Sequence, residues 1–175
     1  PLPFYVAVEF YGASPRGRNM KCGILEHAMA ACANGLSLCK IRPCASPFFI
    51  STDYCKPAIR LSALMELPVI YIFTHDSIGV GEDGPTHQPI EHLIALRAVP
   101  GLSVIRPADA NEVVEAWRVI MQLRKEPAVL VLTRQALPTI DRTKSAAASG
   151  VAKGAYVPAE TPGAKPDAIL PGPAR

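Results

Sequence analysis

Two histidines and three acidic residues lie together in one glycine-rich segment, Thr74-His-Asp-Ser-Ile-Gly-Val-Gly-Glu-Asp-Gly-Pro-Thr-His87. The segment follows the apolar run 67–73, which predicts a loop at the carboxyl end of a buried strand. In open α/β sheets, ligands bind beyond that end. Imidazole titrates near neutral pH, so His75 and His87 are candidates to hydrogen-bond a hydroxylated or phosphorylated substrate and to move protons. A plain polar surface loop is the alternative.

Two other kinds of site are less compatible with this segment. Residues 79–84 match the G-x-G-x-x-G pattern of dinucleotide-binding folds, but Glu82 and Asp83 would place negative charge beside a pyrophosphate, so we reject that match. A metal site would combine both loop histidines and His92 with nearby carboxylates. Their spacing matches no known helical pair of ligands, and we expect no metal ligand in this chain.

Glu26 is a carboxylate within the otherwise apolar helical stretch 22–36. A buried carboxylate without a partner costs several kcal/mol and tends to hold a proton, so Glu26 is a candidate acid/base group. The alternative is that it faces solvent at the helix edge, and periodicity does not decide between the two.

Three aromatic residues and one arginine are further candidates. Phe48, Phe49 and Tyr54 surround a predicted strand-to-helix turn, where they could stack on a flat ring or pack into the core. Arg134 follows the last predicted strand, and its planar donor fork suits a phosphate, although a surface arginine is the alternative.

The elements that must position these side chains alternate along the chain. Strand-like apolar segments and segments of helical periodicity follow one another from about residue 20, which predicts an α/β fold: a doubly wound, mainly parallel sheet with helices on both faces. Asp109 and Glu112 have the spacing of a capping box. We expect strands at 47–51, 67–73, 103–106 and 128–133, and helices at 22–36, 54–67, 89–97 and 113–123. Gly35 is the expected stop of the first helix.

Composition defines the class of protein. The 175 residues suit one domain, and 49% hydrophobic with 19% charged residues excludes global disorder. The net charge of +3 is spread along the chain, so we expect no nucleic-acid partner, and no apolar run approaches the length of a membrane span. Five cysteines without paired spacing indicate reduced thiols, and we expect a cytoplasmic location, with a plastid as the other possibility.

The chain divides into three predicted parts. Residues 1–18 form an irregular N-terminal segment, 19–145 the α/β domain, and 146–175 an Ala/Pro/Gly-rich linker or tail that cannot form a packed core of its own. The first residues, without an initiator methionine, suggest a piece of a longer chain.

The run Thr74–His92 closely resembles the transketolase family, specifically its pyrimidine-binding middle domain. Arg106-Pro-Ala-Asp109, Leu132-Thr-Arg-Gln135 and Leu137-Pro138 extend the resemblance, which covers roughly residues 19–157. It implies the thiamine diphosphate-binding fold.

The resemblance also implies roles for single residues. Glu26, within the family's Gly-x-x-Glu-His motif, would hydrogen-bond the aminopyrimidine ring of thiamine diphosphate and promote its activation. Phe48 and Tyr54 match aromatic positions around that ring. The positions that match residues holding the sugar hydroxyls and the substrate phosphate are His75, Asp83, His87 and Arg134, and we expect His75 and His87 to be catalytic as well.

The implied activity is transfer of a two-carbon ketol unit from a ketose phosphate to an aldose phosphate. In this family a separate N-terminal domain holds the diphosphate and its Mg²⁺, and the active site forms between the two subunits of a homodimer. We therefore expect no turnover from this chain alone.

Three residues depart from the family's pattern. Ser51 stands where an aromatic residue commonly stacks on the pyrimidine, Leu25 replaces an arginine, and Cys22 replaces an aromatic residue. They leave an alternative function open, a non-catalytic binding or assembly module of the same fold that has lost cofactor affinity.

Overall fold

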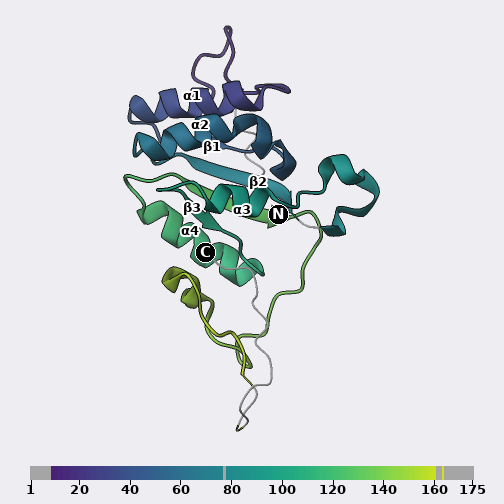
Figure 1. The fold of residues 1–175 in the computed structure, drawn as a ribbon. Helices are drawn as coiled ribbons and strands as arrows, with labels where there is room; N and C mark the ends of the chain where they lie inside the picture. Colours follow the sequence, from purple (N-terminus) through teal and green to yellow (C-terminus); the bar gives the residue numbers. More distant parts are fainter. Residues whose placement is uncertain (1–8, 77, 161–162, 164–175) are drawn as a thin grey trace.

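A four-stranded parallel sheet forms the centre of the computed structural model, which describes residues 9–76, 78–160 and 163 (Figure 1). The strand order is β1-β2-β4-β3, so the chain crosses over between strands that are not neighbours. The strands are β1 (Cys44–Ala45), β2 (Ile70–Asp76), β3 (Ser103–Ile105) and β4 (Ala128–Thr133). Since all neighbouring strands are parallel, their carboxyl ends share one border of the sheet, here called the carboxyl edge.

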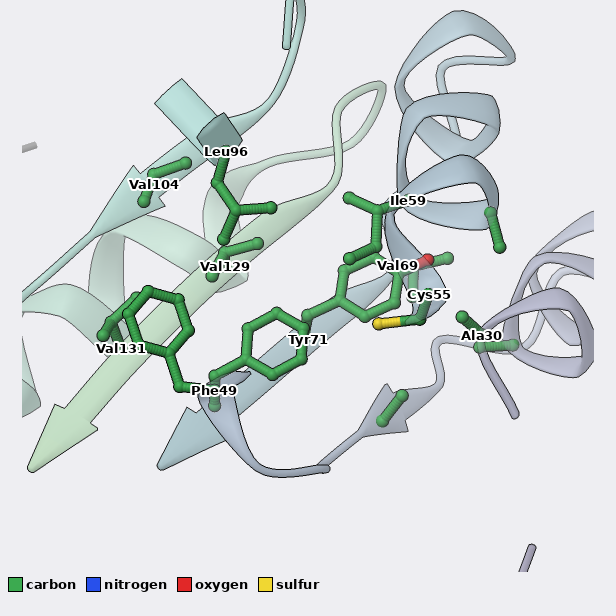
Figure 2. Packing of buried hydrophobic residues seen from close by; sticks show 14 of the residues in the cluster. Ala30, Phe49, Cys55, Ile59, Val69, Tyr71, Leu96, Val104, Val129 and Val131 are labelled. Carbon is green, nitrogen blue, oxygen red and sulfur yellow. The ribbon is translucent and has the colours of Figure 1, made fainter. Parts of the chain in front are cut away.

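Both faces of the sheet are buried, and successive strand residues contribute to opposite faces. On one face Tyr71 packs with Val129 and Val131 (Figure 2), and Phe73 belongs to the same buried cluster. On the other face Ile70 and Leu130 pack with residues of α4. The helices are α1 (Glu26–Leu38), α2 (Thr52–Leu64), α3 (His92–Arg97) and α4 (Ala110–Gln122), and they confirm the predicted α/β fold with helices on both faces.

The helix expected from residue 22 begins only at Glu26, and Gly35 lies inside it instead of ending it. The chain leaves the helix at Lys40, whose φ of +66° is left-handed. The Lys40 N–H donates to the Ser37 carbonyl and the Ile41 N–H to the Leu36 carbonyl, the bond pattern of a Schellman motif, so a lysine performs the role expected of the glycine.

The strand expected at 47–51 is wrong. The paired residues are Cys44 and Ala45, Phe48 adds a single bridge to Thr74, and residues 49–51 form a short 3₁₀ helix, η1 (Phe49–Ser51). Phe49 is buried there, whereas Phe48 is 44% exposed, and η1 leads directly into α2. Periodicity alone does not distinguish such a short apolar run from a strand.

The other expected elements are present with shifted ends. The strand expected at 67–73 runs from Ile70 to Asp76, and the helix expected from Pro89 begins at His92. Asp109 caps α4 by accepting a hydrogen bond from the Glu112 N–H, and the Glu112 carboxylate accepts one from the Ala108 N–H, close to the predicted capping box.

Part of the segment after residue 145 packs against the domain. It forms a 3₁₀ helix, η4 (Ala148–Lys153), which lies beside α4 (Figure 1). Val151 is buried in the cluster that α4 helps to form, and the partly buried Tyr156 packs against this cluster. The division of the chain at residues 18 and 145 stays a prediction. Parts of the two outer segments, residues 1–8, 161–162 and 164–175, lie outside the described residues.

No helix among the described residues is long and apolar enough to cross a membrane.

Candidate functional site

Three polar or aromatic side chains reach the carboxyl edge directly from the strands. Phe48 comes three residues after β1, His75 lies near the end of β2, and Arg134 follows β4 immediately. The loop after β2 returns to the same edge through two short 3₁₀ helices, η2 (Ile78–Asp83) and η3 (Pro85–His87). No α-helix begins within residues 78–91, so this loop lacks the strand-to-helix turn of a dinucleotide fingerprint, in agreement with our rejection of that match.

One phenyl ring contacts both histidines of the loop. The Phe48 ring meets the His75 imidazole edge-to-face at 4.7 Å between ring centroids, and it meets the His87 imidazole at 5.3 Å. Thr74 and Thr86 place hydroxyl oxygens 3.1 and 3.0 Å from the Nδ1 atoms of His75 and His87. The Nε2 atom of each ring is therefore the one oriented away from the neighbouring threonine.

Asp83 links His75 to Arg134. Its Oδ2 lies 2.9 Å from the Nε of Arg134 and 4.0 Å from the Nε2 of His75. The structure thus brings together five of the predicted site residues, which we call the edge cluster: Phe48, His75, Asp83, His87 and Arg134.

Glu26 lies at the same edge of the sheet, on a neighbouring helix. Because α1 ends just before β1 begins, the first turn of α1 lies toward the carboxyl edge, beside the first turns of α2 (Figure 1). The Glu26 side chain is half-buried, and within the described residues no hydrogen bond or ion pair engages its carboxylate. The pKa of the buried Cys55 thiol rises to about 12, mainly through burial and then through the negative charge of Glu26, which places this carboxylate close to α2.

The predicted aromatic cluster is divided between the core and the surface. Phe49 is 1% exposed and packs in the core (Figure 2). Its ring centroid lies 6.0 Å from that of Phe73. Phe48 is 44% exposed and belongs to the edge cluster, whereas Tyr54 is 67% exposed on α2. The ring of Phe49 is therefore not available to stack on a pyrimidine in place of the aromatic side chain that is missing at Ser51. Ser51 itself is buried, and its carbonyl oxygen accepts a hydrogen bond from the Cys55 thiol.

His92 does not join His75 and His87. It is 2% exposed at the start of α3, and its Nε2 lies 3.1 Å from a carboxylate oxygen of Asp53 on α2. With Glu91, these residues place three potential ligand atoms within 4.8 Å of one another. The hydrogen bond between His92 and Asp53 accounts for most of this proximity, because it holds α3 against α2.

Sequence reasoning missed one charged pair at the carboxyl edge. Asp76 is the last residue of β2, is 5% exposed, and forms an ion pair with the Nε of Arg106, which follows β3. Both residues stand directly at strand ends, a position that already marked His75 and Arg134. The signal was thus present, but we assigned it no role.

Comparison with known proteins shows which family the chain is similar to. Residues 6–139 match the model of the transketolase pyrimidine-binding domain. A transketolase of Bacillus subtilis is 53% identical over 165 residues, 94% of this chain but 25% of that protein. The chain spans about a quarter of the length of the curated relatives it matches.

Solved structures agree with this similarity. A transketolase of Pichia stipitis, in complex with sedoheptulose 7-phosphate, superposes with a TM-score of 0.83 at 39% identity over 91% of this chain and 24% of that chain. An inactive β4 tetramer of a split-gene transketolase superposes with a TM-score of 0.62 at 28% identity, over 74% of this chain and 41% of that chain.

Proposed function

The chain belongs to the transketolase family, and we propose that it supplies the pyrimidine-binding half of an active site that transfers a two-carbon ketol unit from a ketose phosphate to an aldose phosphate. The edge cluster is the observation that carries this proposal, because one phenyl ring contacts two imidazoles, and a carboxylate joins one of these imidazoles to a guanidinium. Such groups hydrogen-bond sugar hydroxyls and pair with phosphate. The Pichia relative bound to a phosphorylated ketose supports the same substrate class.

The residues near Glu26 fit the pyrimidine part of thiamine diphosphate. The carboxyl group of Glu26 is half-buried and without a hydrogen bond in the described part of the chain, so a ring nitrogen would satisfy it. Phe48 and Tyr54 keep exposed aromatic surface, which would contact a flat heterocycle. We assign no Mg²⁺ ligand to this chain and propose that the metal and the diphosphate are held by another domain.

When bound, thiamine diphosphate would supply a nucleophilic carbon and an electron sink for cleaving the bond beside a ketose carbonyl. The chain's own residues have simpler tasks. Glu26 holds or releases a proton at a pyrimidine ring nitrogen. His75 and His87 hydrogen-bond substrate hydroxyls and move protons, while Asp83 and Arg134 orient the sugar and its phosphate.

We further propose that the complete protein is a homodimer whose active sites form between subunits, and that this chain alone does not turn over substrate. The inactive tetramer of the split-gene relative, to which this chain is similar, supports the second point. The alternative to ketol transfer is a non-catalytic binding or assembly module of the same fold that has lost cofactor affinity. The buried Ser51 and the 62% exposed Leu25 favour that alternative because neither offers an aromatic face or a positive charge to a cofactor.

Substituting Glu26→Gln in the complete natural protein tests the proposed function. A glutamine keeps the shape of the side chain but cannot exchange the proton, so kcat for ketol transfer should fall by about 10²-fold or more. The fold should be unchanged, because the Glu26 carboxylate makes no hydrogen bond or ion pair within the described residues. Glu66→Gln, at an exposed carboxylate after α2, is the matched control and should retain wild-type kcat. Near-normal turnover of Glu26→Gln would remove the proposed proton role.

A further inference from the structure

His75 occupies an unusual backbone position within β2. Its φ is +70°, a left-handed conformation that costs free energy for any residue with a Cβ. The pairing of β2 with β4 shifts between Thr74 and Asp76, so His75 is the extra residue of a β-bulge. The bulge turns the imidazole toward Phe48 and Asp83, and the surrounding structure must hold it there.

The residue after the bulge is fixed by a bond that crosses the sheet. Asp76 pairs with Arg106, but β2 and β3 are not neighbours, because β4 lies between them. The Arg106 side chain therefore reaches past the carboxyl end of β4 to meet Asp76. Asp76 is 5% exposed, so its carboxylate depends on this partner, since an unpaired charge is costly to bury.

We propose that Asp76 and Arg106 are positioning residues, which hold the bulge of β2 so that the His75 imidazole stays in the edge cluster. Both act through His75 and not by contact with substrate. This inference rests on the proposed function only for the role of His75, because the bulge and the ion pair are features of the fold itself.

The simplest alternative is that the ion pair only stabilises the sheet. The two possibilities differ in a double-mutant cycle between Arg106→Leu and His75→Ala. If Arg106 acts through His75, its replacement matters only while the imidazole is present. If it stabilises the sheet alone, its replacement has the same effect with and without the imidazole.

The cycle is measured in the complete natural protein, as kcat/KM for a ketose phosphate donor. We expect Arg106→Leu to lower kcat/KM by about tenfold in the wild-type background and less than about twofold in the His75→Ala background. Arg106→Lys, which keeps the charge, should recover part of the loss. Arg118→Leu breaks an exposed ion pair on α4 and should leave kcat/KM unchanged. Equal losses in both backgrounds would overturn the inference.

A crystal structure of the Arg106→Leu variant separates this inference from the proposed function. We expect the His75 φ to leave the left-handed region, or its ring to move out of contact with Phe48. An unchanged bulge would overturn the positioning role whatever the kinetics show. If that variant fails to fold, Arg106→Lys takes its place in both measurements. A wild-type protein without ketol transfer would refute the proposed function, and the structure of the variant would still decide this inference.

Discussion

Arg134 is held at the carboxyl edge by its 2.9 Å bond to Asp83, yet 42% of its side chain remains exposed. A guanidinium in this position is already oriented before a ligand arrives, so little side-chain entropy is lost when it pairs with a phosphate. Asp83 also lies near His75, so one carboxylate orients two groups at once.

Arg134→Leu should therefore raise KM for phosphorylated substrates. Hydrogen bonds to charged groups contribute about 1.5–3 kcal/mol, which corresponds to roughly 10- to 150-fold in KM, with a smaller effect on kcat. The measurement compares a phosphorylated ketose with its unphosphorylated counterpart, in the variant and in Arg118→Leu. The same change with both sugars would argue against a phosphate contact.

The sequence predicted the residues of the edge cluster better than the charged pair Asp76 and Arg106 beside it. The residue types of the glycine-rich loop and their position after a strand were sufficient to select His75 and His87, which the structure brings into contact with Phe48. Asp83 was selected only by the family resemblance, and it lies near His75. The roles of these residues and of Glu26 and Tyr54 stay predictions. Asp76 was missed because its partner, Arg106, lies thirty positions away, and such pairs depend on strand order.

Among the elements, α4 shows how local sequence signals can determine a helix start. Asp109 accepts the Glu112 N–H, and it also accepts the Ile140 N–H and pairs with Arg142 from the segment after β4. Burial alone would raise the pKa of Asp109, but these hydrogen bonds and the positive charge of Arg142 outweigh burial and lower it. The cap thus joins a helix to a distant segment.

The lowered pKa predicts how stability depends on pH. A carboxyl group with a lower pKa in the folded state stabilises the fold above its unfolded pKa of about 4, and this contribution is lost as pH falls through the folded pKa. Urea unfolding of the chain should show Asp109→Asn less stable than wild type at pH 7, by about 1–3 kcal/mol, with a difference that shrinks toward pH 3. Glu66→Gln, an exposed carboxylate after α2, is the control. A difference that is constant across this pH range would contradict the linkage.

The elements that sequence reasoning placed wrongly are a short apolar run and a helix end. Residues 47–51 have a length and composition that also suit a buried strand, but residues 49–51 turn directly into α2 as η1. The end of α1 was misplaced because Lys40, not Gly35, adopts the left-handed conformation, and the N–H groups of Lys40 and Ile41 bond to carbonyls of the last helical turn.

For the molecule as a whole, residues 140–156, after β4, pack against α4. Arg142 pairs with Asp109 and hydrogen-bonds Tyr156, whose hydroxyl in turn donates to Glu112. Val151 then completes the core beside α4. Composition suggested a linker because alanine, proline and glycine bury little apolar area, but this segment is held by a buried polar network that composition does not reveal.

We propose that this domain holds the pyrimidine of thiamine diphosphate within a larger protein. Calorimetric titration of the complete natural protein, with Mg²⁺ present, tests it by comparing thiamine diphosphate with inorganic diphosphate. We predict saturable binding of thiamine diphosphate at least about tenfold tighter than that of diphosphate, and a smaller advantage in Glu26→Gln, because one hydrogen bond to the ring is weakened. No binding of thiamine diphosphate, or an advantage unchanged by Glu26→Gln, would contradict the account.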